Sequence, residues 1–119
     1  MGWFIDKNRP ICPQIEEQLC AKIARGEFKA GERLLSVRDI ALTAGVNPNT
    51  VQKALEKLKN DEIIYSIGGS GWYVGEDNKH AKKVLGELIK RKTDAYFEEL
   101  MLLGCGEDEI KDLVKEWNK

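Results

Sequence analysis

The sequence predicts a mainly helical domain with one small β-hairpin, followed by a two-helix tail. In the first half of the chain, apolar residues recur at helical spacing through three short segments. The pattern then changes to β-branched and aromatic runs around a glycine-rich turn, before helical spacing returns in a long and a short segment. The chain has 119 residues, of which 42% are hydrophobic and 33% charged. This size and balance indicate one folded domain with an appendage and exclude a two-domain enzyme.

The chain opens with a short apolar stretch, residues 3–5, which we expect to form an arm or a strand. The alternative is a partly ordered terminus. A first helix is predicted over residues 12–25, since Pro13 suits a first helical turn and Gly26 is a plausible stop. Its buried face is expected to consist of Ile15, Leu19 and Ile23.

Two short helices are predicted next, over residues 36–44 and 48–60. Ser36 and Asp39 have the spacing of a capping box at the start of the first. Asn47 is a favourable N-cap for the second. A glycine-containing turn of about three residues joins them, which is the spacing of a helix-turn-helix.

The predicted hairpin consists of residues 63–67 and 72–74, joined by a glycine-rich turn at residues 68–71. Three helices followed by a two-stranded hairpin is the order of elements in a winged helix. We therefore predict a winged helix-turn-helix domain over residues 1–75.

The tail, residues 76–119, is predicted to contain helices over 78–103 and 107–118. Its apolar stripe is wider than one winged helix can cover, so we expect it to pack against a second copy of the chain. The alternative is that both helices fold back on their own domain. The expected dimerisation residues are Leu85, Leu88, Ile89, Tyr96, Leu100, Leu113 and Trp117.

The formal net charge of −1 conceals an uneven distribution. Residues 1–75 carry 10 Lys and Arg against 9 Asp and Glu, whereas residues 76–119 carry 9 against 11. Residues 33–60 carry five basic and two acidic side chains, a local net charge of +3. The local charge therefore favours a polyanionic partner, although the overall charge does not.

Three cysteines and one histidine limit the chemistry that the chain can perform. Cys12, Cys20 and Cys105 form no CxxC pair, so we expect buried thiols, with a redox sensor as the alternative. His80 is the only histidine, which argues against histidine-based metal sites and catalytic triads. We expect no enzyme, no cofactor and no metal. There is no apolar run of about 18 residues and no signal peptide, so we expect a cytoplasmic protein with no membrane partner.

The predicted helix-turn-helix carries the candidate DNA-binding residues. DNA recognition requires polar side chains at the N-terminus of a rigid helix, where they reach base edges in the major groove. The alternative is that Asn47 and Thr50 only cap the helix and that the others form a solvated face. The side chains expected to read bases are Asn47, Asn49, Thr50 and Gln52. Those expected to bind phosphates are Arg33, Arg38 and Lys53 or Lys57.

Four motifs follow one another with continuous spacing between Pro13 and Val74. They are Ala30-Gly31-Glu32-Arg33-Leu34, Ser36-Val37-Arg38-Asp39-Ile40-Ala41, Gly45-Val46-Asn47-Pro48-Asn49-Thr50-Val51 and Gly69-Ser70-Gly71. With these motifs the stretch resembles the DNA-binding domain of the GntR family of bacterial transcription regulators. The resemblance implies a phosphate contact by Arg38 and a wing tip, Gly69 and Ser70, that approaches the minor groove. This wing contains no Lys or Arg, so we expect no strong arginine contact from it.

Only 44 residues follow Gly75, too few for a metabolite-binding domain. This resembles the short YtrA-like subfamily, whose brief helical tail mediates dimerisation. The resemblance implies a homodimeric repressor of a pseudo-palindromic operator in double-stranded DNA, and often an adjacent ABC transporter operon. No residue cluster identifies a small-molecule effector. The alternative function is a winged helix that acts as a protein-interaction module, which the acidic balance and the uncharged wing would support.

Overall fold

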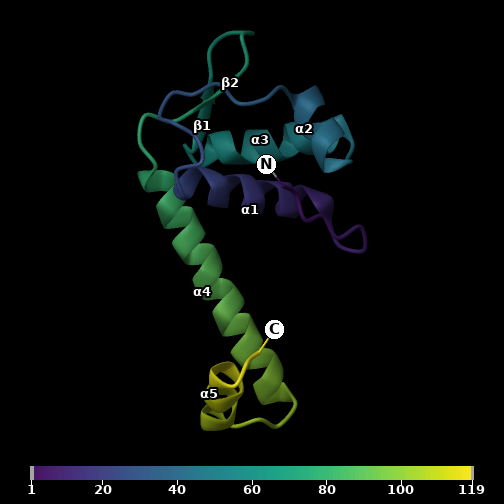
Figure 1. Cartoon of the computed structure of the whole chain (residues 1–119), viewed down its shortest axis with the longest axis vertical. Helices are drawn as coiled ribbons and strands as arrows, with labels where there is room; N and C mark the ends of the chain where they lie inside the picture. The colour runs from purple at the N-terminus through teal and green to yellow at the C-terminus, as the bar shows by residue number, and fades with distance from the viewer. Residues whose placement is uncertain (1, 119) are drawn as a thin grey trace. The chain divides into compact units, whose positions relative to one another are not determined.

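The computed structural model describes residues 2–118, which form two compact units divided between Leu85 and Gly86. The fold is mainly helical with one two-stranded sheet, as predicted. The first unit contains α1 (Ile11–Ala24), α2 (Val37–Ala44), α3 (Pro48–Asn60), β1 (Ile64–Ser66) and β2 (Trp72–Val74). The elements that follow are α4 (Lys79–Leu102), which runs from the first unit into the second, and α5 (Glu107–Lys115) (Figure 1).

The core of the first unit lies between α1 and α3, which pack side by side, while α2 packs against α3 (Figure 1). Ile15 of α1 and Val51 and Leu55 of α3 have no exposed surface. Each such side chain contributes about 1.5–3 kcal/mol relative to an exposed position. Ile15, Leu19 and Ile23, the face predicted from their spacing, are all buried. The apolar period therefore determines how α1 is oriented against the core.

Both helices of the helix-turn-helix have the N-cap residue that their sequences predict, but of the capping box expected at α2 only the Ser36 half is formed among the described residues. The backbone N–H of Asp39 donates to Oγ of Ser36 at 3.1 Å, and that of Asn49 donates to Oδ1 of Asn47 at 2.7 Å. Gly45 ends α2 in the left-handed conformation, with φ +69°, which glycine adopts without strain. These local bonds fix the conformation of the turn between α2 and α3.

The sheet pairs β1 with β2 in antiparallel register, with Tyr65 opposite Tyr73. Residues 31–34 run beside β2 on its other edge. Leu34 donates its N–H to the carbonyl oxygen of Trp72, and Val74 donates its N–H to that of Glu32, both at 2.8 Å. No local pattern indicates this pairing, because its partners lie about forty positions apart in the chain.

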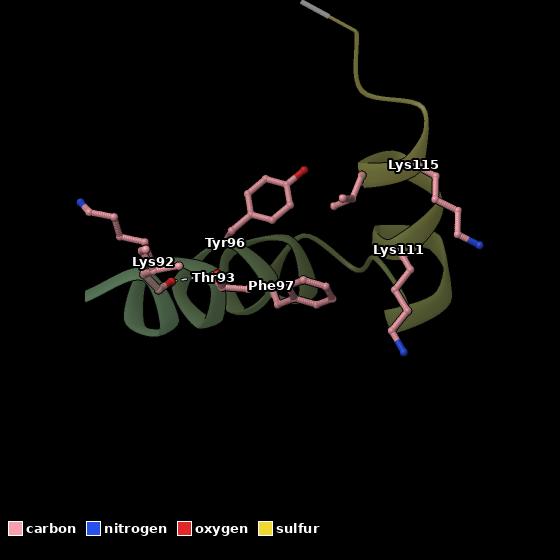
Figure 2. A pocket seen from close by; sticks show the side chains of 8 residues that line it. Lys92, Thr93, Tyr96, Phe97, Lys111 and Lys115 are labelled. Carbon is pink, nitrogen blue, oxygen red and sulfur yellow. Dashed lines mark hydrogen bonds between the residues drawn. The ribbon is translucent and has the colours of Figure 1, made fainter. Parts of the chain in front are cut away.

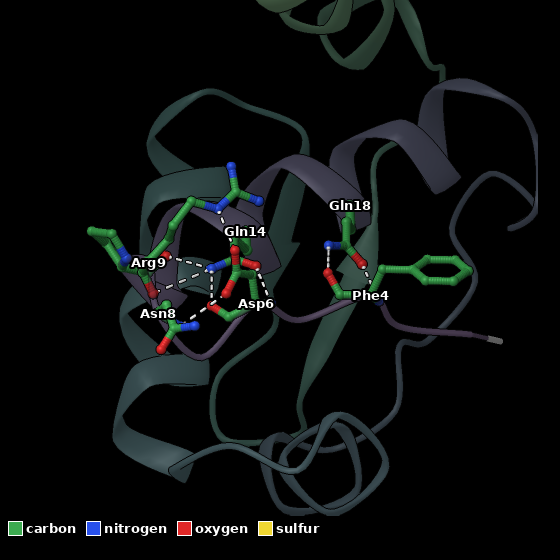
Figure 3. A network of polar contacts seen from close by, with 7 residues as sticks. Phe4, Asp6, Asn8, Arg9, Gln14 and Gln18 are labelled. Atoms are coloured by element: carbon green, nitrogen blue, oxygen red, sulfur yellow. Dashed lines mark hydrogen bonds and ion pairs between the residues drawn. The ribbon is translucent and has the colours of Figure 1, made fainter. Parts of the chain in front are cut away.

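The predicted helix and strand boundaries agree with the observed ones to within one residue, except at the end of the last helix. Residues 3–5 take the first of the two forms expected for them, an arm and not a strand, and the side chain of Gln18 bonds to the backbone of Phe4 as a partner strand would. Its amide donates to the carbonyl oxygen of Phe4 at 2.8 Å, and its oxygen accepts the N–H of Phe4 at 3.0 Å (Figure 3). The last helix, predicted to reach residue 118, ends at Lys115.

The first turns of α4 belong to the first unit. Ala81 is buried in its core, and Val84 and Leu85 pack against that core. In the second unit, Ile110 of α5 is fully buried. No helix in the described part of the chain is long and apolar enough to cross a membrane.

Candidate nucleic-acid interface

The N-terminal turn of α3 presents polar side chains to solvent without any acidic residue. Asn47, Asn49, Gln52 and Lys53 are exposed, and Thr50 is half-buried. Pro48 has no N–H, and the N–H groups of Asn49, Thr50 and Val51 are already bonded to Asn47, so it is the helix dipole that favours negative charge here. This end of α3 is therefore suited to meet a polyanion such as DNA.

The amides of this turn differ in how free they are to bind a ligand. Asn47 uses its oxygen to cap α3, and Gln52 donates its amide to Oε1 of Glu56 at 3.1 Å. The side chain of Asn49 makes no hydrogen bond within residues 2–118. Asn49 is thus the side chain that can present both a donor and an acceptor to a base edge without breaking an internal contact.

The cations expected to bind phosphates are also distinguished by their contacts. Arg38 is exposed in the first turn of α2, and it forms no ion pair within the described residues. Lys53 is likewise exposed and unpaired there. Lys57, the alternative to Lys53, has Nζ 3.2 Å from Oδ1 of Asp61. The structure therefore favours Lys53 over Lys57.

The wing turn is exposed at Gly69 and Ser70, the residues predicted to approach the minor groove. The hydroxyl of Ser70 donates to the carbonyl oxygen of Ile67 at 2.7 Å and lies 3.2 Å from the Tyr73 hydroxyl. These contacts order the wing tip internally. They leave its backbone, rather than the Ser70 side chain, as the surface available to DNA.

Arg33 lies beside the wing, although its position in the chain precedes α2. It forms a β-bridge with Tyr73, and its guanidinium group lies against Gly71. A Cβ atom on Gly71 would stand 2.9 Å from Nε of Arg33. The wing, which contains no cation of its own, thus receives one from the segment that pairs with β2. A DNA contact by Arg33 stays a prediction, and so does the lack of a strong arginine contact from the wing turn itself, whose residues 68–71 include no Lys or Arg.

The cysteines are free thiols. Cys20 is 2% exposed and its Sγ lies 3.5 Å from the carbonyl oxygen of Ala81. Burial raises the pKa of Cys20 to about 11, with a smaller contribution from the charge of Asp61. Burial also raises the pKa of Cys12, and the hydrogen bond to Glu16 acts in the same direction. Both thiols therefore stay protonated at neutral pH, which disfavours redox chemistry.

The second unit contains an open apolar cavity of about 670 Å³ between α4 and α5 (Figure 2). Tyr96 and Phe97 line it in an edge-to-face pair, with ring centroids 6.2 Å apart. The lysine side chains on α5, Lys111 and Lys115, extend away from these rings (Figure 2). The cavity is therefore apolar at its centre and charged at its rim.

The residues expected at a dimer interface fall into two groups. Leu88 is buried, and Leu85 and Leu100 are half-buried. The other four are largely exposed: Ile89 is 48%, Tyr96 43%, Leu113 44% and Trp117 74% exposed. Within a single chain this leaves an apolar surface in the second unit without cover.

Comparison with known proteins matches the first unit to one family model and the whole chain to several relatives. The family model described as "Bacterial regulatory proteins, gntR family" matches residues 13–74. The "HTH-type transcriptional repressor YtrA" of Bacillus subtilis (strain 168) is 32% identical over 92% of this chain and 85% of its own length. The "Uncharacterized HTH-type transcriptional regulator YhcF" of the same organism is 25% identical over 94% of this chain and 93% of its own. The solved structure of a GntR family transcriptional regulator from Listeria monocytogenes has a TM-score of 0.82 and 34% identity. It covers 96% of this chain and 100% of its own.

Proposed function

Because this chain belongs to the gntR family of bacterial regulatory proteins, we propose that it acts as a homodimeric repressor at a pseudo-palindromic operator. Like its relatives, it is a DNA-binding transcriptional regulator and not an enzyme. The observation that carries the proposal is the N-terminal turn of α3. Its exposed side-chain amides, with no acidic side chain beside them, are suited to reading bases in the major groove.

In this proposal Asn49 is the main residue that reads the DNA sequence. Its free amide can pair bidentately with the N6 and N7 atoms of an adenine. In this proposal Thr50 touches a thymine methyl group, and Asn47 retains its amide N–H donors while its oxygen caps the helix. Gln52 can contribute only if its bond to Glu56 opens.

Affinity that does not depend on sequence falls to Arg38 and Lys53, which bind backbone phosphates in this proposal. Gly69 and Ser70 bring the wing backbone to the minor groove, and Arg33 supplies positive charge beside them. A narrow minor groove attracts arginine through its negative potential.

Dimerisation falls to residues 76–119, the tail. Ile89, Tyr96, Leu113 and Trp117 offer the exposed apolar surface that a second copy would cover. Leu88 is buried and Leu100 half-buried within the chain, and Leu85 packs against the core of the first unit, so these three offer a second copy less surface. A two-fold dimer places two recognition helices about one DNA turn apart, which explains why the operator should be pseudo-palindromic.

The relative named YtrA is described as a repressor, which supports repression here. An adjacent ABC transporter operon as the regulated target follows from the resemblance to the YtrA-like subfamily, and a cytoplasmic location follows from a role in transcription. A small-molecule effector is left unassigned. The alternative, a protein-interaction module without specific DNA binding, was suggested by the uncharged wing. The position of Arg33 beside Gly71 weakens that argument.

The proposal is tested by fluorescence anisotropy with two duplexes, the DNA upstream of the protein's own gene and a scrambled version. We expect the first to bind about 10³-fold more tightly or better. Arg38→Ala should weaken binding to both duplexes by about 1–2 kcal/mol. Equal affinity of the wild-type protein for the two duplexes would contradict sequence-specific regulation. Sedimentation of the free protein as a monomer, together with binding of one subunit per duplex, would contradict the dimer.

A further inference from the structure

The N-terminal arm, residues 2–10, is held firmly against the first unit. Gln14, which is only 7% exposed, accepts the N–H of Asp6 on its oxygen at 2.7 Å. Its amide lies within hydrogen-bond distance of three arm carbonyl oxygens, those of Asp6 at 2.9 Å, Arg9 at 3.3 Å and Pro10 at 2.9 Å (Figure 3). A buried amide satisfied in this way fixes the path of the backbone around it.

The arm also turns tightly on itself. The carboxylate of Asp6 accepts the N–H of Asn8 at 2.9 Å and pairs with Nε of Arg9 at 3.1 Å (Figure 3). The N–H of Arg9 donates to the carbonyl oxygen of Asp6 at 3.2 Å. Lys7 is exposed within this turn. The turn's one carboxylate, that of Asp6, is already paired with Arg9.

Lys7 reaches the helix-turn-helix. Its ammonium group donates to the carbonyl oxygen of Gly45, the residue that ends α2. Gly45 precedes Asn47, the N-cap of α3, by two positions, so the two lie within about 7 Å of each other. The ammonium group is thus placed beside the end of α3 that faces DNA in the proposed function.

The segment that Lys7 joins has no positive charge of its own. No Lys or Arg occurs between Arg38 and Lys53. An ammonium group has three donors, and the bond to Gly45 uses one, so two remain for an acceptor outside the chain. On these grounds, and resting on the proposed function, we propose that the N-terminal arm is part of the DNA interface and that Lys7 binds a backbone phosphate beside the recognition helix.

A purely structural role for Lys7, binding the carbonyl oxygen of Gly45 just after α2, makes a different prediction. Such a cap would affect the stability of the fold but would not change how DNA binding depends on salt. A phosphate contact releases counterions, so its loss changes the slope of log affinity against log salt concentration by about 0.9. Salt dependence therefore separates the two roles.

The experiment measures the binding of a random-sequence duplex by the wild-type chain, Lys7→Ala and Lys7→Arg, between about 50 and 200 mM salt. Lys82→Ala, an exposed lysine on α4, is the control with the same change of charge. We expect Lys7→Ala to make the slope shallower by about 0.9 per bound subunit, so that its deficit in affinity shrinks about threefold across this range. Lys7→Arg should restore the wild-type slope, and Lys82→Ala should keep it.

Two results would overturn the inference. One is a Lys7→Ala slope equal to that of the wild type, with or without a lower melting temperature. The other is an equally large change in Lys82→Ala, which would make the effect one of net charge alone. Failure of the wild-type chain to bind any duplex is a separate result that contradicts the proposed function itself.

Discussion

Replacing Gly71 by alanine perturbs the contact between the wing and Arg33. Gly71 has φ +123°, a conformation that L side chains rarely adopt. Its new Cβ atom would lie 2.9 Å from Nε and 3.1 Å from Nη2 of Arg33, closer than van der Waals contact allows. The guanidinium group must therefore move away from the wing, and the turn must bear the backbone strain.

The strain at such a position is about 1–3 kcal/mol, and we expect the free energy of unfolding to fall by this amount. For a domain of this size, each kcal/mol lowers the melting temperature by about 4–8 °C. Thermal unfolding followed by circular dichroism measures this loss. Because Arg33 is displaced, affinity for duplex DNA should also fall, in the same direction as in Arg33→Ala.

Gly69→Ala is the matched control for stability, since it lies in the same turn, where a Cβ atom would meet nothing within 4 Å. Its free energy of unfolding should stay within about 0.5 kcal/mol of the wild type. In an Arg33→Ala background, Gly71→Ala should lower the free energy of unfolding by less than in the wild type, because the new Cβ atom no longer meets the guanidinium group. A melting temperature of Gly71→Ala equal to that of the wild type would refute the reasoning.

Three further predictions follow from local features of the fold. Ser36→Ala removes the N-cap of α2 and should lower the free energy of unfolding by about 1 kcal/mol in urea titrations. Ser36→Asp keeps a capping oxygen and should keep the wild-type free energy of unfolding, so equal losses in the two variants would argue against the cap. Gly86→Ala places a methyl group in open space within α4 and should raise stability by about 0.5–1 kcal/mol, so an unchanged unfolding midpoint would count against it. The pKa of the Cys20 thiol is raised by burial from 9.0 to about 11, so the unfolded chain loses this proton first as pH rises. Stability should therefore fall by about 2–3 kcal/mol between pH 9 and 11, and the loss should be smaller in Cys20→Ala; equal pH dependence of the two proteins would contradict this.

The elements that local sequence patterns predict well are those whose stabilising contacts are also local. The bounds of α3 follow from its cap at Asn47 and its apolar period, both of which lie within one segment. The turn of the helix-turn-helix follows in the same way from Gly45, which reaches a left-handed conformation without strain. The order of helices and hairpin was therefore predictable before any tertiary contact was known.

The cations near the proposed DNA interface could not be placed in the same way. Arg33 is brought to the wing by a bridge to Tyr73, and Lys7 reaches the helix-turn-helix turn through the carbonyl oxygen of Gly45. Each contact joins residues about forty positions apart, and neither leaves a periodic or capping signal in the sequence. Charge counted along the chain consequently underestimates the positive charge at the wing and at the N-terminus of α3.

The most direct test of the account is a set of affinities for duplexes in which each base pair of the bound operator is replaced in turn. The wild-type chain and Asn49→Ala are compared on the same set. We predict that Asn49→Ala loses about 1–3 kcal/mol of discrimination at one base position in each half-site and keeps its preferences elsewhere. A uniform loss of affinity at every position, with all preferences retained, would contradict the assignment of sequence readout to the N-terminal turn of α3.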